Sequence, residues 1–348
     1  MSNRSNRLLV GALAMAAAGY AGYKVSKNAQ ALKALNPERA PGKWTISDIP
    51  DQSGKVIIVT GANSGLGFET ARALAAKGAQ VVMACRNEEK AKQAAQEILA
   101  EFPQAHLDLI ALDLANLASV RAFADNFNRR YQKLDALCNN AGIMAIPYRQ
   151  TADGFEMQFG VNHLGHFALT GLLLNTLKAT SGARVVTVSS MAHRLGKIDF
   201  DNLNGEKSYR RWPVYGQSKL ANLLFSYELQ RRFDAAGIPV LAMTAHPGWA
   251  STNLQYAGAQ MDGCQLMLKG NQVANALFAQ SQRMGALPQL YALTAPDVEG
   301  GAYYGPDGFR GTHGYPVRAN STPRSHNQAD AARLWEVSEA LTGVKYKF

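Results

Sequence analysis

Short apolar runs alternate with longer segments of helical periodicity over most of this chain. The runs predict strands at 55–60, 80–85, 107–114, 135–142, 184–190 and 239–248. Segments with helical spacing separate them, for example 64–77, 87–101, 117–130 and 215–236. Strands that are apolar on both faces and alternate with helices are typical of a parallel sheet covered on both sides. We therefore expect an α/β fold, a single domain built on a doubly wound parallel sheet.

Two later segments contain apolar residues but no predicted strand. Residues 253–300 are rich in Leu, Met and Ala, which suits either a lid over a binding site or helices of the core. Residues 328–343 carry apolar positions at helical spacing. This spacing predicts an amphipathic helix that closes the fold.

The first tenth of the chain has a pattern of its own. Leu8–Tyr23 is a stretch of sixteen residues without a charge, bracketed by Arg7 and Lys24. A membrane-spanning helix takes about 20 apolar residues, so the segment suits a short anchor, a cleaved secretory signal or a helix lying on a membrane surface. We expect residues 1–35 to form this basic-flanked segment and residues 36–53, with three prolines, to form a linker that wraps onto a domain at 54–348.

Charge and cysteine usage exclude several classes of protein. The formal net charge is +10, but residues 1–37 contain five Lys or Arg and no acidic residue, so half of the excess lies there. The rest of the chain has no basic run with interleaved aromatics, which argues against nucleic-acid binding. Cys85, Cys138 and Cys264 are far apart in the sequence. That spacing excludes a disulfide framework and fits a reducing compartment, the cytoplasm.

Three glycines follow the first predicted strand, in "TGANSGLG" (60–67). Gly61, Gly65 and Gly67 would let the backbone approach a phosphate at a helix N-terminus, where free N–H groups and the helix dipole favour an anion. Their spacing differs from the dinucleotide fingerprint G-x-G-x-x-G. The loop by itself indicates a nucleotide, with an ordinary glycine-rich turn as the alternative.

The residue that follows the second predicted strand bears on the choice of nucleotide. A ribose with a free 2′-OH usually meets an Asp or Glu about 20 residues beyond the glycines. Here Cys85 and then Arg86 occupy that place. A guanidinium can bind a 2′-phosphate through its planar fork, so NADP is favoured over NAD, unless Arg86 is only a surface residue.

A tyrosine and a lysine occupy one face of a later helix, in "YGQSK". Tyr215 and Lys219 are at i and i+4, where side chains are neighbours. A free tyrosine has a pKa near 10, and we expect the lysine cation to lower that pKa and make the phenol a useful acid or base.

These motifs occur in an order that resembles the short-chain dehydrogenase/reductase family. They are "TGANSGLG", "NNAG" at 139–142, a serine after the fifth strand, Y-x-x-x-K, and "PGWAST" after the sixth strand. The resemblance covers about residues 54–310. It implies a Rossmann-like fold, an NAD(P) cofactor and oxidoreductase activity.

The resemblance also implies roles for single residues. Ser190 matches the catalytic serine, with Ser189 as the second choice; Tyr215 matches the acid/base, and Lys219 the lysine that also binds the nicotinamide ribose. Asn162 matches the asparagine that holds a water leading protons toward the lysine. The matching cofactor-binding residues, besides Tyr215 and Lys219, are Gly61, Asn63, Ser64, Gly65, Leu66, Gly67, Arg86, Asp113, Leu114, Asn140, Ala141, Gly142, Pro247, Gly248 and Thr252.

The implied reaction interconverts an alcohol and an aldehyde or ketone by hydride transfer with NADPH. The stretches "TADGFEMQFGVNHLGHFALT" and "VSSMAHRLGKIDFDNLNGEKSY" resemble retinol dehydrogenases and their bacterial relatives, which implies a lipophilic substrate. The alternatives are an enzyme similar to protochlorophyllide reductase, a non-catalytic NADP-binding protein on the same fold, and, more remotely, a methyltransferase. The catalytic domain is expected in the cytoplasm, attached to a membrane through residues 8–23, and a homo-oligomer is left open.

His163 and His166 form an H-x-x-H pattern that could in principle bind a metal. No further Cys or His supports such a site. We expect no metal, and expect both side chains to pack near the helix that carries Asn162.

Overall fold

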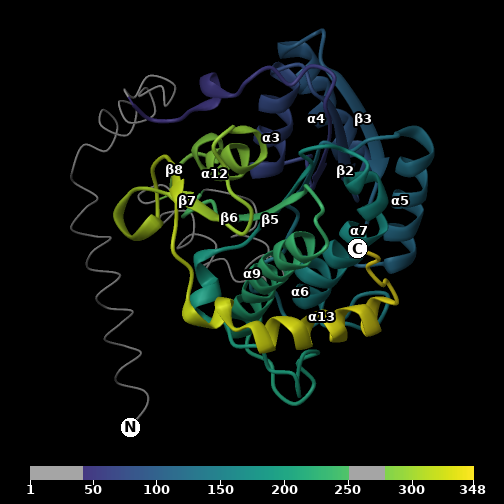
Figure 1. Cartoon of the computed structure of the whole chain (residues 1–348), viewed down its shortest axis with the longest axis vertical. Coiled ribbons are helices and arrows are strands. Elements are labelled where there is room, and N and C mark those ends of the chain that lie inside the picture. Colours follow the sequence, from purple (N-terminus) through teal and green to yellow (C-terminus); the bar gives the residue numbers. More distant parts are fainter. Residues whose placement is uncertain (1–41, 251–278) are drawn as a thin grey trace. The chain divides into compact units, whose positions relative to one another are not determined.

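The six predicted strands are all present, and two further strands extend the same sheet. The computed structural model describes residues 42–250 and 279–348. Its strands are β1 (Val56–Thr60), β2 (Gln80–Cys85), β3 (His106–Ala111), β4 (Ala136–Asn139), β5 (Arg184–Val188), β6 (Leu241–Ala245), β7 (Tyr303–Pro306) and β8 (Pro316–Arg318). The order in the sheet is β3-β2-β1-β4-β5-β6-β7-β8. Every neighbouring pair is parallel except β7 and β8. The strand order reverses between β1 and β4, which confirms the doubly wound sheet (Figure 1).

Helices cover both faces of this sheet. The longer ones are α3 (Gly65–Ala76), α4 (Glu88–Glu101), α5 (Leu117–Arg130), α7 (Gly165–Leu172), α9 (Arg211–Ala235), α12 (Gln282–Thr294) and α13 (Gln328–Thr342). Short helical segments are η2 (Ile46–Asp48), α6 (Met157–Phe159), η3 (Gly160–Leu164), α8 (Leu174–Lys178), η4 (Met191–Leu195), η5 (Phe309–Gly311) and η6 (Pro323–His326). One apolar cluster joins the sheet to α3, α4 and α12, and a second joins it to α5, α7 and α9.

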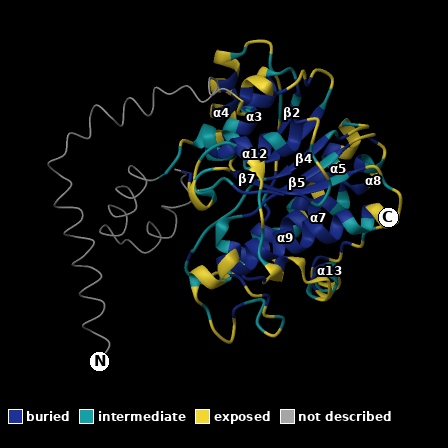
Figure 2. Cartoon of the chain, turned by 60° about the vertical axis from the view of Figure 1, so that its left-hand side comes forward, coloured by how far each residue is buried: buried dark blue, intermediate teal, exposed yellow. Residues whose placement is uncertain are grey.

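The two clusters follow from the alternation of side chains along each strand. In β1, Ile57 and Val59 belong to the cluster with α3, whereas Val56 and Ile58 belong to the cluster with α5. Successive side chains of a strand point to opposite faces, so a strand covered on both sides must be apolar throughout. Figure 2 shows the central strands as buried. This is why the strands appear in the sequence as continuous apolar runs.

The chain divides into two compact units, Met1–Lys43 and Trp44–Phe348, and the sheet belongs to the second. Within that unit, the ring of Trp44 packs edge-on against Tyr291 at 5.2 Å between centroids. Ile46 and Ile49 are buried in the core. The stretch from Trp44 to the start of β1 is therefore an integral part of the second unit.

Strands β7 and β8 are the elements that the apolar pattern missed. They contain four and three residues, with the sequences YYGP and PVR. Runs this short, interrupted by Gly or Pro, carry no periodic signal. The predicted strand at 107–114 also extended too far, because β3 ends at Ala111.

The later helices agree with the sequence pattern where they are described. α13 occupies the predicted closing segment and buries Leu334 and Trp335. α12 buries Leu287 and Leu290 in the core, so this part of 253–300 is a core helix; residues 251–278 lie outside the described part. Among residues 42–250 and 279–348, no helix is long and apolar enough to cross a membrane, and Leu8–Tyr23 lies outside these ranges.

Candidate active site

The predicted site residues meet at the carboxyl ends of the central parallel strands. β1 pairs with β4, β4 with β5, and β5 with β6, all in parallel. The segments that follow these strands therefore emerge at one edge of the sheet, as ligand-binding segments do in doubly wound folds. They are the glycine loop after β1, the "NNAG" turn after β4, Ser189–Ser190 after β5, and His246–Gly248 after β6.

The glycine loop brings backbone against backbone where side chains would not fit. Gly61 and Gly65 have positive φ angles of 67° and 60°, a region that residues with a Cβ rarely adopt. A Cβ on Gly67 would collide with the carbonyl oxygen of Gly61 and with the side-chain nitrogen of Asn140. Ser64 precedes α3 but its side chain does not cap the helix, so the first N–H groups of α3 are available to an anion. The loop therefore fits the pyrophosphate of a dinucleotide.

A cleft of about 470 Å³ opens beside this loop. Its lining includes Asn63, Ser64 and Gly65 from the loop, Lys90 from α4 and Gln282 from α12. Arg86 is exposed at the end of β2, and its side chain forms no ion pair within the described part of the chain. Lys90, in the first turn of α4, was not anticipated from the sequence. A cation in the first turn of the helix that follows Arg86 is the signal that could have found it.

Ser190 and Tyr215 lie side by side, and Lys219 lies one turn further along α9. Ser190 caps η4, where its Oγ accepts a hydrogen bond from the backbone of Ala192 at 3.2 Å. The side chain of Ser190 lies beside the phenol of Tyr215, where it acts to lower the pKa of that phenol. Lys219 Nζ lies 5.9 Å from the centroid of the Tyr215 ring and donates to the carbonyl oxygen of Val188 at 3.1 Å. Two hydroxyls thus adjoin a buried amine at the end of β5.

The two neighbouring serines have different environments. Ser189 is buried, and its hydroxyl donates to the backbone carbonyl of Lys219 at 2.8 Å. That bond attaches β5 to α9. Ser190 is less buried and faces the phenol, which supports the choice of Ser190 over Ser189.

The pKa of Tyr215 differs from the expectation. Burial raises it to about 12, and the hydrogen bond from Ser190 lowers it only in part. Burial also lowers the pKa of Lys219 to about 8. The sequence argument, that the lysine would lower the tyrosine pKa, was wrong for this structure because desolvation of the buried phenol outweighs an amine that is bonded to Val188.

Asn162 lies in the π-helix η3, and both polar atoms of its side chain are hydrogen-bonded. Its Oδ1 accepts from the backbone of Ile143 at 2.8 Å, and its Nδ2 donates to the carbonyl of Ile143 at 3.0 Å and to Ser218 Oγ at 2.9 Å. The side chain therefore fixes the peptide groups of Ile143. A Cβ on Gly142, the last residue of the "NNAG" turn, would lie 3.1 Å from Asn162 Oδ1 and 3.4 Å from Lys219 Nζ.

The remaining predicted cofactor residues are placed as follows. Asp113 accepts from the backbone of Ala115 at 3.0 Å, and Leu114 is buried beside it after β3. Asn140 Nδ2 donates to the carbonyl of Thr60 at 2.7 Å. Pro247 and Gly248 follow β6, with Gly248 at a positive φ of 64°. Thr252 lies outside the described residues.

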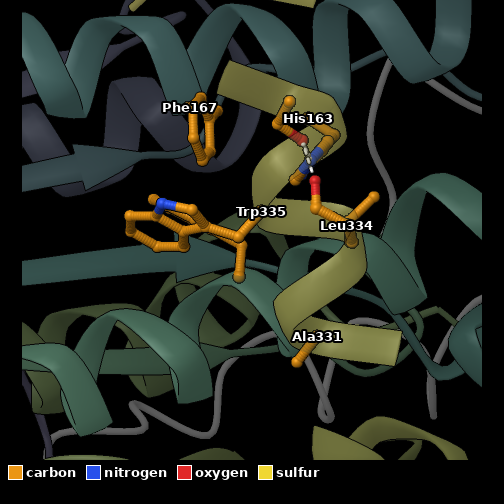
Figure 3. Close-up of a pocket in the computed structure, with 7 residues that line it drawn as sticks. His163, Phe167, Ala331, Leu334 and Trp335 are labelled. Carbon is orange, nitrogen blue, oxygen red and sulfur yellow. Dashed lines mark hydrogen bonds between the residues drawn. The ribbon is translucent and has the colours of Figure 1, made fainter. Parts of the chain in front are cut away.

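His163 and His166 point to different partners. His163 Nε2 is 2.9 Å from Ser338 Oγ of α13, beside Phe167 and Trp335, in the small pocket of Figure 3. His166 Nε2 is 3.0 Å from Thr60 Oγ1 on the other side. Burial lowers the pKa of His163 to about 3 and that of His166 to about 4. Both rings are packed and neutral, and no group of three or more potential metal ligands occurs within residues 42–250 and 279–348.

Comparison with known proteins places this geometry in a family. The short chain dehydrogenase family profile matches residues 55–262. Retinol dehydrogenase 14 of Mus musculus is 40% identical over 303 residues, covering 84% of this chain and 86% of the relative. Retinol dehydrogenase 12 of Homo sapiens is 42% identical over 296 residues, covering 84% and 88%. The crystal structure of an uncharacterised protein from Mycobacterium paratuberculosis has 42% identity and a TM-score of 0.73, covering 88% of this chain and all of that one. The chain belongs to the short-chain dehydrogenase/reductase family, and within it resembles the retinol dehydrogenases, as the motifs predicted.

Proposed function

We propose that this protein is an NADP(H)-dependent oxidoreductase that interconverts a lipophilic alcohol and the corresponding aldehyde or ketone. The observation that carries the proposal is the placement of the Ser190 hydroxyl beside the buried phenol of Tyr215, with Lys219 buried one helical turn away. Two adjacent hydroxyls can both reach the oxygen of one carbonyl group. The substrate would therefore be placed with its oxygen between Ser190 and Tyr215.

The residues of this chain supply the proton chemistry. A bound reduced nicotinamide supplies the hydride for the carbonyl carbon. Ser190 donates a hydrogen bond to the carbonyl oxygen, and Tyr215 transfers its phenolic proton to that oxygen. A pKa of about 12 keeps the phenol protonated at neutral pH, so the proton to be transferred is present. A general acid works best with a pKa near the working pH, so the positive charge of Lys219 has to lower the pKa of the phenol during transfer. Lys219 provides positive charge near the phenolate that remains.

Several residues fit the cofactor. Gly67 lies so close to Gly61 that a side chain at Gly67 would not fit. The glycines keep the backbone of the loop bare, so a pyrophosphate can approach it. Lys90 lines the cleft beside the loop together with Glu69 and Glu97, and Arg86 is exposed at the end of β2. These two cations are the basis for preferring NADP over NAD. Gly142, adjacent to Lys219 Nζ, allows a ribose to approach the lysine.

Apolar side chains near the catalytic residues support a lipophilic substrate. Leu195, at the end of η4, and Trp212, with its ring 6.1 Å from that of Tyr215, are both exposed. Trp249, after Pro247 and Gly248, is also exposed. One exposed aromatic side chain thus adjoins Tyr215, and two more exposed apolar side chains stand on the segments that follow β5 and β6. Such side chains favour an apolar ligand, and the names of the relatives suggest a retinoid or similar chain.

We extend the proposal to location. Residues 8–23 would attach the enzyme to a membrane with its catalytic domain in the cytoplasm, where Lys24 and Lys27 favour anionic lipid. A lipophilic substrate could then reach the site from the bilayer.

The test is NADPH oxidation by the purified protein with retinal, medium-chain aldehydes and ketones. Tyr215→Phe should abolish turnover and leave NADPH binding nearly unchanged, because the phenol transfers a proton and contributes little to cofactor contact. Tyr227→Phe is the matched control: Tyr227 lies on the same helix, and its hydroxyl meets Ser321 Oγ at 2.9 Å. Near-normal turnover by Tyr215→Phe would refute the assignment.

A further inference from the structure

The hydroxyl of Thr60, the last residue of β1, is buried and lies within hydrogen-bonding distance of four polar atoms. Its Oγ1 accepts from the backbone N–H groups of Asn140 and Ala141, each at 2.9 Å. It lies 3.0 Å from His166 Nε2 and 3.3 Å from the carbonyl oxygen of Cys138. The hydroxyl has one hydrogen and two lone pairs. Both lone pairs accept hydrogen bonds from the "NNAG" turn. The hydroxyl hydrogen is therefore available to donate to His166 or to the carbonyl oxygen of Cys138.

The tautomer of His166 decides this choice. His166 Nδ1 is 3.1 Å from the carbonyl oxygen of Asn162, which can only accept. Nδ1 must therefore carry a hydrogen. Burial keeps the ring neutral, so Nε2 has none and accepts from Thr60 Oγ1. The shorter of the two distances from Thr60 agrees with this direction.

The imidazole of His166 is hydrogen-bonded to both Thr60 and Asn162, the two residues that hold segment 140–143. Asn140 and Ala141 are bonded to Thr60, whereas Ile143 is bonded at both its peptide groups to the side chain of Asn162. His166 connects Thr60 to Asn162. Gly142, in the middle of the segment, is the residue that closely approaches Lys219 Nζ.

We propose that His166 is a positioning residue whose neutral imidazole ties Thr60 to Asn162 and thereby holds segment 140–143 against Lys219 and the cofactor. The inference rests on the proposed function for its effect on the cofactor. The segment contains three residues matched to cofactor binding and adjoins Lys219, which is matched to the nicotinamide ribose, so a shift there changes cofactor affinity. The H-x-x-H pattern is then explained without a metal: His166 serves the site, and His163 serves the packing of α13.

Three substitutions separate the two ends of the bridge. His166→Leu removes both hydrogen bonds and keeps the volume. His166→Asn keeps a donor near the Nδ1 position, toward Asn162, and His166→Gln keeps an acceptor near the Nε2 position, toward Thr60. His163→Leu is the matched control, because His163 is equally buried one turn earlier and bonds to α13.

Two readouts test the role. NADPH titration by fluorescence should give a Kd raised about tenfold in His166→Leu, the effect of about one hydrogen bond, and a smaller rise in the Asn and Gln variants. Hydrogen–deuterium exchange should show faster exchange of the amides of Asn140, Ala141 and Ile143 in His166→Leu. His163→Leu should lower the melting temperature without either change.

The outcomes are decisive in both directions. Unchanged exchange at residues 140–143 in the His166 variants would overturn the inference, and so would an equal effect in His163→Leu. If His166→Leu does not fold, the Asn and Gln variants decide by the same exchange measurement. A wild-type protein that failed to bind NADPH would refute the proposed function, and the exchange data would still test the bridge.

Discussion

Acidification should destabilise this protein through histidines that the fold buries in their neutral form. Burial lowers the pKa of His163 to about 3, of His166 to about 4 and of His246 to about 3, from an ordinary value of 6.5. Between pH 6.5 and these values the unfolded chain binds protons that the folded chain does not. The stabilising effect of a depressed pKa is therefore complete above pH 6.5 and is lost as the pH falls.

The size of the loss follows from these values. At about pH 5.5 each histidine of the unfolded chain is roughly 90% protonated, while the buried rings remain neutral. Each buried histidine then lowers the free energy of unfolding by about 1.4 kcal/mol, the equivalent of one pKa unit. Three such histidines lower it by roughly 4 kcal/mol. That is a large part of the 5–15 kcal/mol by which domains are typically stable. Burial raises the pKa of Glu156, which acts in the opposite sense, whereas burial lowers the pKa of His193, which adds to the loss.

Urea unfolding followed by circular dichroism, at about pH 7.5 and about pH 5.5, measures how far the free energy of unfolding falls on acidification. His163→Leu should be less stable at neutral pH, but its loss on acidification should be smaller than that of the wild type by about 1.4 kcal/mol. An identical loss in the variant and the wild type would refute the claim that His163 is buried and neutral.

Two further predictions follow from the proposed function. Arg86→Asp should reduce the preference for NADPH over NADH by roughly one to two orders of magnitude, because it replaces a charge-assisted bond to the 2′-phosphate with repulsion; an unchanged ratio of kcat/KM values for the two cofactors would show that Arg86 has no such role. The full chain should partition to membranes, whereas a chain that starts at Asn36 should remain in the supernatant and keep its turnover; recovery of the intact full chain wholly in the supernatant at physiological salt would refute the anchor.

The sequence was sufficient to predict the six parallel strands and to predict that most of the site residues lie close together. Parallel strands covered on both faces must be apolar throughout, so β1, β2, β4, β5 and β6 are visible as runs. The edge strand β3 is less buried and includes His106 and Asp108. The carboxyl ends of the parallel strands lie at one edge of the sheet, so the residues after each run, such as Gly61, Asn140 and Ser190, could be expected to lie together. Tyr215 and Lys219 follow from helical spacing alone.

Other properties depend on contacts between distant segments. Strands β7 and β8 are too short and too interrupted to carry a period. β7 forms by pairing with the edge of β6, and β8 forms by pairing with β7. The pKa of Tyr215 depends on how far the phenol is desolvated, which spacing to a lysine does not determine. The bridge from Thr60 through His166 to Asn162 joins residues 106 positions apart across the sheet edge.

The sequence by itself thus determined what is periodic or local: the strands, the helix faces, the glycine loop and the identity of the groups available for chemistry. Only the tertiary structure decided how those groups are solvated and which of them touch. Burial and hydrogen bonding set the protonation state of His166, Tyr215 and Lys219, and both arise from neighbours that are remote along the chain.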